Sequence, residues 1–218
     1  MPAFYSDEQR ALQEQFQTGK MADLLEHVIV HPEVQEAERE FIESRDMFFL
    51  ATVDGTGQPT CSYKGGDPGF VKVVDPGTIA FPSYDGNGMF LSMGNIRATA
   101  RVGLLFIDLE TPHRLRVQGT ASVGERDPLL AAYTGADLVV RIAVDRIFVN
   151  CSRYVHRYQR LESSRYVPRA HCETPFAEWK RIDLVQDALS PRDAGKTAAA
   201  GGTITEDEYE AKLAAGEA

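Results

Sequence analysis

The sequence predicts a mainly β protein, a barrel or a sandwich, with helices flanking it. Between residues 47 and 149, short β-prone runs alternate with turn signals such as Asp54-Gly55 and Asp75-Pro76-Gly77 at intervals of about eight to twelve residues. The first 46 residues instead carry helical periodicity. A chain of 218 residues with 43% apolar content can bury a sizeable core, which fits one domain with added segments.

Three short helices are expected before residue 47. Ser6 and Gln9 fit a capping box that starts the first helix, and Gly19 ends it. The second helix carries an apolar stripe with i, i+3, i+4, i+7 spacing, formed by Met21, Leu24, Leu25 and Val28. Pro32 suits the first turn of the third helix, whose buried side is expected to hold Val34, Ala37, Phe41 and Ile42.

Seven or eight strands are expected in the middle of the chain, at residues 47–53, 60–64, 70–74, 78–81, 102–107 and 114–123, with one or two more in 138–149. A short helix is expected over 89–97, and Asp127-Pro128 begins another of about two turns. Residues 150–179 are helical or irregular in pattern, and the last 25 residues are expected to be mobile, with a helical turn from Thr205. The predicted organisation is a helical extension (1–46), a barrel with its C-terminal segment (47–183) and a tail (184–218).

The formal net charge of −9 is concentrated at the two ends of the chain. Residues 1–46 carry −7, residues 194–218 carry −3, and the middle carries +1. This distribution argues against a nucleic acid partner but allows a small anionic ligand in the middle. No apolar run approaches the roughly 20 residues that span a bilayer, and no secretory signal is evident. With three widely spaced cysteines, the sequence favours a cytoplasmic protein without membrane association.

Several catalytic and binding patterns are weak or absent. His27 and His31 have i, i+4 spacing, but Pro32 breaks the helix that would align them, so no metal site is predicted. Cys151 and His156 match no nucleophile motif. Tyrosines are interleaved with arginines over residues 153–169. Such a pattern could bind a single-stranded nucleic acid by stacking and charge, but it is more typical of a helix face or of residues that line a ligand pocket.

One set of polar groups does point to a ligand. Lys64 ends a strand beside a glycine loop, and Asp85-Gly86-Asn87-Gly88 precedes a helix, whose first N–H groups bind anions readily. Additional positive charge and hydroxyl donors lie nearby in the sequence: Arg97, Arg114, Arg116, Ser62 and Ser83. The sequence therefore predicts a phosphate site that anchors a nucleotide-like ligand.

Residues 41–182 resemble the pyridoxamine 5′-phosphate oxidase-like FMN-binding split barrels. Three motifs carry the resemblance: FIESRDMFFLATVDGTGQPTCSYKGGDPGFVKVVDPGTIAFPSYDGNGMFLSMGNI (41–96), VGLLFID (102–108) and RLRVQGTASV (114–123). NCSRYVHRYQ (150–159) and PFAEWKRID (175–183) look like the flavin-nucleotide-binding protein subgroup. The resemblance implies a six-stranded antiparallel split barrel that forms a homodimer and binds two FMN molecules between its subunits.

The resemblance also implies roles for individual residues. Eleven residues would bind FMN: Ser62, Tyr63, Lys64, Phe81, Pro82, Ser83, Asn87, Gly88, Asn95, Arg97 and Arg114, the last reaching the cofactor of the neighbouring chain. Phe70, Arg153 and Tyr154 are candidates on the substrate side. Many relatives carry Arg or Lys where this chain has Gly88, which shifts the phosphate contact toward Lys64, Arg97 or backbone N–H groups. The chain also lacks the basic substrate-binding end of the true oxidases, ending instead in AKLAAGEA.

We therefore expect a small FMN-dependent oxidoreductase, with the redox chemistry on the flavin and no protein nucleophile. Three alternatives stay open at this level: a deazaflavin-dependent reductase, a flavin carrier or sensor without turnover, and a haem-binding barrel. The last would need an axial ligand, for which His156 and His171 are the candidates.

Overall fold

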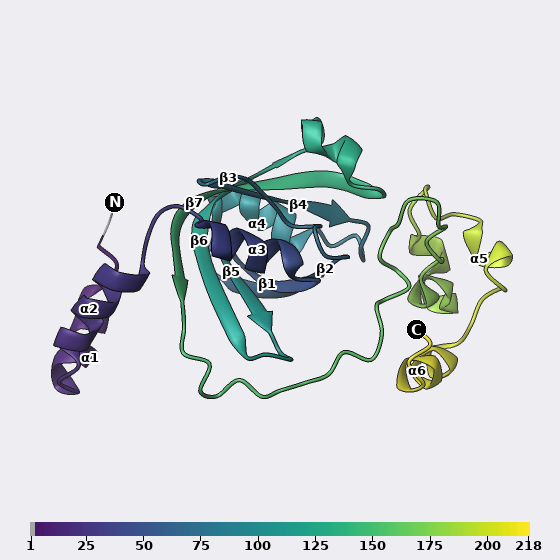
Figure 1. Ribbon diagram of the computed structural model, residues 1–218. Helices are drawn as coiled ribbons and strands as arrows, with labels where there is room; N and C mark the ends of the chain where they lie inside the picture. The colour runs from purple at the N-terminus through teal and green to yellow at the C-terminus, as the bar shows by residue number, and fades with distance from the viewer. Residues whose placement is uncertain (1–2) are drawn as a thin grey trace. The chain divides into compact units, whose positions relative to one another are not determined.

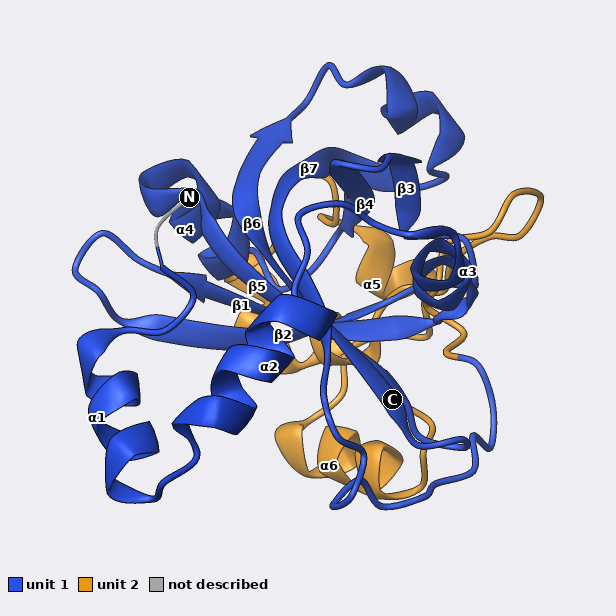
Figure 2. Cartoon of the chain, turned by 60° about the vertical axis from the view of Figure 1, so that its left-hand side comes forward, with its two compact units in different colours: residues 1–163 blue, residues 164–218 orange. Residues whose placement is uncertain are grey.

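The computed structural model describes residues 3–218 and divides into two compact units, Met1–Ser163 and Ser164–Ala218 (Figure 2). The domain limits predicted at residues 46 and 183 were placed where the sequence pattern changes, whereas the two compact units are separated by their internal packing. The predicted limits stay predictions. Within residues 3–218, the helices are all too short or too polar to cross a bilayer.

The first unit is built on one antiparallel sheet of seven strands in the order β2-β1-β5-β6-β7-β4-β3 (Figure 1). The strands are β1 (Met47–Val53), β2 (Pro59–Gly65), β3 (Lys72–Asp75), β4 (Thr78–Tyr84), β5 (Arg101–Asp108), β6 (His113–Gly124) and β7 (Ala136–Val149). The mainly β prediction is confirmed. The expectation of seven or eight strands from the residue pattern is confirmed, and the strand expected over 70–74 is β3, at one edge beside β4. The sheet has one strand more than the six that the resemblance implies, and it does not close.

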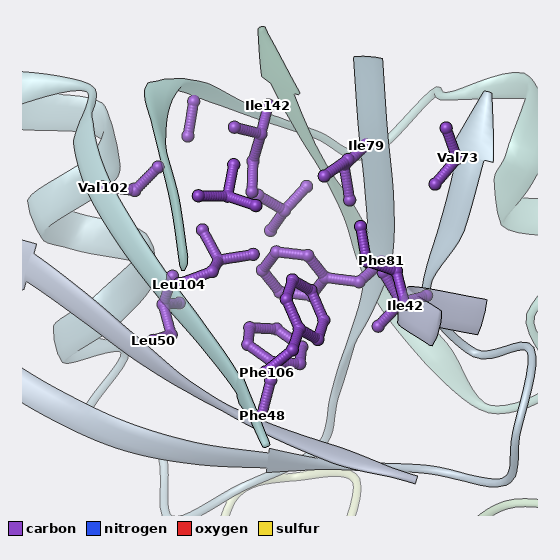
Figure 3. Close-up of a cluster of buried hydrophobic side chains, with 14 of the residues drawn as sticks. Ile42, Phe48, Leu50, Val73, Ile79, Phe81, Val102, Leu104, Phe106 and Ile142 are labelled. Carbon is purple, nitrogen blue, oxygen red and sulfur yellow. The ribbon is translucent and has the colours of Figure 1, made fainter. Parts of the chain in front are cut away.

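The core lies on the concave side of this sheet. The rings of Phe48, Phe81 and Phe106 meet at its centre (Figure 3), with the Phe48 centroid 5.0 Å from that of Phe81 and 5.2 Å from that of Phe106. The alternation predicted for residues 114–123 is confirmed, because Leu115 and Val117 are buried while Arg116 is exposed. Side-chain alternation of this kind fixes which face of each strand meets the core.

Three helices precede the sheet: α1 (Asp7–Gln15), α2 (Gly19–Ile29) and α3 (Glu36–Ser44). The capping box of Ser6 and Gln9 is present at the start of α1, as predicted. The start of the third helix at Pro32 is wrong. His31 instead forms an antiparallel bridge to Ile147 of β7, and a capping box of Gln35 and Glu38 begins α3 four residues later. Val34 and Ile42 are buried as expected, but Ala37 is exposed.

The remaining elements of the first unit are α4 (Leu91–Thr99) and the short 3-10 helix η1 (Pro128–Ala132). Residues 138–149 belong to a single strand, β7, which is long enough to pair with both β6 and β4. Residues 150–163, which follow it, contain neither helix nor strand.

The second unit consists of η2 (Glu178–Arg181), η3 (Asp183–Ala188), α5 (Lys196–Ala199) and α6 (Glu206–Ala214). Thr205 and Glu208 form a capping box that starts α6, so the helical turn predicted from Thr205 is confirmed. Lys180 is buried and its ammonium lies 2.8 Å from the Asp193 carboxylate, which also accepts from the Ser190 hydroxyl at 3.0 Å. A paired, hydrogen-bonded charge is the form in which a lysine tolerates burial.

Replacing Asp127 should destabilise the first unit in a pH-dependent way. The Arg141 guanidinium donates two hydrogen bonds to this carboxylate, which also caps η1, and this lowers the pKa of Asp127. The pair therefore stabilises the protein above the usual carboxyl pKa of about 3.9, and the stabilisation is lost as the pH falls through the lowered pKa. We expect Asp127→Asn to cost about 1–2 kcal/mol at pH 7 and much less at pH 3.

Thermal melts of both proteins at the two pH values test this expectation. Glu125→Gln is the matched control, because Glu125 is an exposed neighbouring acid whose side chain keeps 72% of its surface accessible. An equal loss for Asp127→Asn at both pH values would contradict the assignment.

Candidate functional site

A pocket of about 360 Å³ opens where β2, β4 and the start of α4 come together. It is lined by Ser62, Lys64, Ser83, Tyr84, Gly86, Asn87, Gly88, Met89, Phe90, Leu91, Ser92 and Met93. Its volume lies in the range of small-molecule sites. Lys64 is the sole formally charged residue among these lining residues, and none of them is an acid. The lining is therefore suited to an anion.

Lys64 is placed in the pocket by strand alternation. Ser62 and Lys64 point from β2 into the pocket, whereas Tyr63 between them lies on the other face, where it is 62% exposed and meets the Phe49 ring edge-on. Partial burial lowers the pKa of Lys64. Desolvation of an ammonium without a counter-charge is costly, and a bound anion would offset that cost.

The second source of positive potential is the N-terminus of α4. Among the described residues no side chain caps this helix, and Phe90 at the N-cap has a left-handed conformation with φ of +51°. Asn87 stabilises the preceding turn by accepting from the Met89 N–H at 3.1 Å. The first N–H groups of a helix have no partner within the helix, and together with the helix dipole they favour an anion. Ser92 of this first turn lines the same pocket as Lys64.

A polar stripe on α4 holds this N-terminus against the sheet. Ser92, Asn95 and Thr99 share one face of the helix, and the Ser92 hydroxyl lies 2.9 Å from that of Ser62. The Asn95 amide donates to the hydroxyls of Thr52 and Thr60 at 3.1 and 3.3 Å. The Thr99 hydroxyl donates to the Val53 carbonyl at 2.7 Å. These directional bonds fix the position of the helix along β1 and β2.

The structure brings together five of the residues predicted from the sequence. Ser62, Lys64, Ser83, Asn87 and Gly88 all line the pocket, although they come from two strands and a loop. Asn95 lies directly behind the pocket wall, where it is buried and bonded to threonines, which suits positioning better than direct contact.

The other predicted residues lie elsewhere. Phe70, Phe81 and Pro82 are buried, and the first two belong to the core cluster, because they stand on the inward face of the sheet and its adjoining loop. Arg97 is in the last turn of α4, at the end opposite the pocket, and pairs with Glu125 at 3.5 Å. Arg114 donates to the Cys151 carbonyl, and Arg153 and Tyr154 lie on the exposed segment after β7. None of these seven residues is part of the pocket lining.

Sequence reasoning missed Ser92, Tyr84 and the apolar lip formed by Met89, Phe90 and Leu91. These three lip side chains are 62, 60 and 51% exposed at the mouth of the pocket. The signal in the sequence was the run of three consecutive large apolar residues directly after a glycine loop. One face of a short helix cannot bury all three, so such a run indicates an exposed apolar surface. Burial and nearby Asp67 raise the pKa of Tyr84, so its hydroxyl stays protonated and can donate to a ligand.

Asn95→Leu should weaken anion binding about tenfold with little change in thermal stability. Leucine fills the same buried space, and Thr52 and Thr60 keep their mutual 2.9 Å hydrogen bond, so no hydroxyl is left without a partner. The helix loses its hydrogen bonds to Thr52 and Thr60, however, and its first N–H groups are no longer held in a fixed orientation toward the pocket. Titration with inorganic phosphate and with FMN, next to a thermal melt, measures both effects.

Ile96→Val is the matched control, since Ile96 is a core residue of the same helix. It should lower stability by about 1 kcal/mol without changing affinity. An affinity of Asn95→Leu equal to that of the unmodified protein would overturn the positioning role.

The fold is that of a mainly β protein with one open antiparallel sheet, flanking helices and a pocket between two strands and a helix N-terminus. More specifically, the sequence profile of the pyridoxamine 5′-phosphate oxidase family matches residues 34–163, and the chain belongs to this family. The match ends where the first compact unit ends.

Among solved structures, HupZ from Group A Streptococcus is 22% identical, with 57% of this chain and 99% of that chain covered and a TM-score of 0.45. An FMN-binding protein from Syntrophomonas wolfei is 9% identical, with coverages of 64% and 97% and a TM-score of 0.44. The haem storage protein HutZ from Vibrio cholerae is 21% identical, with coverages of 53% and 94% and a TM-score of 0.41. The search of curated proteins gave no match.

Proposed function

We propose that this protein binds FMN and acts as a small flavin oxidoreductase. The observation that carries the proposal is the acid-free pocket in which a partly buried lysine and an uncapped helix N-terminus face the same space. Such a site suits the phosphate of a ligand that also has a larger polar and aromatic body. Membership of the pyridoxamine 5′-phosphate oxidase family supports FMN as that ligand.

The residues present fit the phosphate end of FMN. Lys64 supplies the charge, the first turn of α4 supplies backbone donors, and hydroxyls of Ser62, Ser83 and Ser92 supply neutral hydrogen bonds. Gly88, with φ of +78° and open space around it, gives the loop its turn without contributing charge. This leaves Lys64 as the main electrostatic anchor.

When bound, the flavin would supply the hydride or electron transfer, so the chain itself needs to bind, orient and shield the cofactor. The apolar lip at the pocket mouth would exclude water from one side of the ligand. We further propose that the protein works as a homodimer, with Arg114, Arg153 and Tyr154 reaching the cofactor or substrate held by the neighbouring subunit. In such a dimer these three residues would contact a ligand, although they are not part of the pocket lining of their own chain.

Titration of the purified protein with FMN, riboflavin and inorganic phosphate tests the proposal. We expect bound-flavin absorbance and fluorescence quenching with FMN, and an affinity at least tenfold weaker for riboflavin, which lacks the phosphate. Equal affinity for FMN and riboflavin would contradict the proposal that the pocket binds the FMN phosphate.

The same preparation separates the alternatives. Tight FMN binding without turnover across a panel of electron donors and acceptors would indicate a carrier or sensor. Displacement of FMN by a deazaflavin cofactor at lower concentration would indicate a deazaflavin reductase. A Soret band lost on replacement of His156 or His171 by alanine would indicate haem binding.

A further inference from the structure

Within residues 3–218, the apolar face of α2 is left exposed to solvent. The α2 stripe, consisting of Met21, Leu24, Leu25 and Val28, remains 58, 55, 41 and 63% exposed. Ala22 is the one buried residue of this helix, and α1 contains none. A helix of this length owes most of its stability to packing of an apolar face, so an uncovered stripe indicates a missing partner.

The hairpin that presents the stripe is nevertheless built into the structure. Arg10 of α1 bonds Asp23 and Glu26 of α2 at 2.5 and 3.3 Å, and so joins the two helices on the side away from the stripe. Phe4 packs edge-on against Phe148 of β7, with ring centroids 5.3 Å apart. The α1–α2 hairpin is thus attached to β7 before α1 and, through the His31 bridge, after α2.

A second uncovered surface lies on residues 151–163, here called the exit segment, which Figure 1 draws as a long irregular stretch after β7. The Tyr158 N–H donates to the Leu109 carbonyl at 2.9 Å, and the Arg157 guanidinium donates to the Glu110 carbonyl at 3.0 Å. These bonds hold the segment on the turn between β5 and β6. Its apolar side chains nevertheless face solvent, Tyr158 at 60% and Leu161 at 96% exposure.

Both surfaces are apolar, and the regions that carry them have opposite net formal charge, although Arg10 pairs with Asp23 and Glu26 and Arg160 pairs with Asp46. Residues 3–30 contain five acids and two bases, a net charge of −3, whereas the exit segment contains three bases and one acid, a net charge of +2. No hydrogen bond, ion pair or ring contact joins them within residues 3–218. The α1–α2 hairpin also precedes the family match, which begins at residue 34.

We propose that the α2 stripe of one copy packs on Tyr158 and Leu161 of the exit segment of a second copy of this chain. The α1–α2 hairpin is then an arm that clasps the partner subunit. A single chain carries both complementary surfaces, so a twofold dimer makes the contact twice. The inference rests on the homodimer proposed above and leaves Arg153 and Tyr154, at the other end of the exit segment, to the pocket.

Site-directed photo-crosslinking tests this contact directly. The 218-residue protein with p-benzoylphenylalanine in place of Leu24 is irradiated as an exchanged mixture of 15N-labelled and unlabelled subunits. We expect peptides that join residue 24 of one isotopic form to residues 151–163 of the other. The matched control carries the same probe at Asp23, on the opposite face of α2, and should give no such peptide.

Each outcome of this experiment has one meaning. Mixed-isotope crosslinks to the exit segment support the arm, and Leu24→Glu should then raise the dimer dissociation constant about tenfold in sedimentation. A dimer whose residue-24 crosslinks fall within one chain or elsewhere overturns the arm but leaves the proposed homodimer intact. A protein that stays monomeric at all concentrations removes the homodimer and the arm together, while FMN titration still reports on the pocket.

Discussion

Gly119→Val should lower the melting temperature of the first unit by about 6–12 °C, which corresponds to a loss of about 3 kcal/mol. Gly119 lies in β6, where the pairing with β7 shifts register between Gln118 and Gly119. A Cβ at this position would stand 2.6 Å from the Ile142 side chain and closer still to the Ala143 carbonyl oxygen. The obstruction is backbone of the paired strand, so no rotamer change can relieve it, and the two longest strands of the sheet must separate locally.

Gly124→Val is the control for this prediction. Gly124 ends the same strand, and nothing lies within 4 Å of the position its Cβ would take. Thermal unfolding followed by circular dichroism should show a change of no more than about 2 °C for Gly124→Val. Similar losses for both variants would show that β-strand glycine as such, rather than the close approach to β7, decides stability here.

Local pattern was sufficient to place most of the sheet. The alternation through Leu115 and Val117 located β6 because the side-chain period of a strand is two, and one face of this strand is fully buried. The start of the third helix was misplaced at Pro32 because the competing interaction is distant in sequence. His31 pairs with β7, more than a hundred residues later, and no local pattern reports such a bridge. By contrast, the short edge strand β3 was predicted over residues 70–74, because it pairs with β4 across the local turn at Asp75-Pro76-Gly77.

The candidate site shows the same division between local and long-range information. Lys64 and the loop at Asn87 and Gly88 were found because glycine-rich turns and strand-end lysines are visible in the sequence. Ser92 was missed because its significance arises from a hydrogen bond to Ser62, thirty residues away. Phe81 was predicted to contact the ligand but is fully buried in the core cluster, whereas Ser83, nearer the end of β4, lines the pocket.

Lys64→Met should weaken FMN binding about 10- to 100-fold, the equivalent of 1–3 kcal/mol, while raising the melting temperature of the ligand-free protein by about 1–3 °C. The two effects have opposite signs for one reason. Burial lowers the pKa of Lys64, so the folded protein holds the charged form at a cost that the bound phosphate offsets. Methionine keeps the stem of the side chain and removes that cost together with the charge.

The same shift sets a pH dependence for the unmodified protein. Because the pKa of Lys64 is lower in the folded than in the unfolded state, the destabilisation is complete below the lowered pKa and is relieved as the pH rises through it. FMN affinity should fall over the same pH range, since the anchor loses its proton, and in Lys64→Met this fall should be absent. Arg97→Met is the matched control: Arg97 is a cation of α4 outside the pocket lining, and its loss should leave both affinity and its pH profile unchanged. If Arg97→Met instead reproduces the loss of affinity and Lys64→Met does not, the phosphate binds at the other end of the helix, and the pocket described here is not the flavin site.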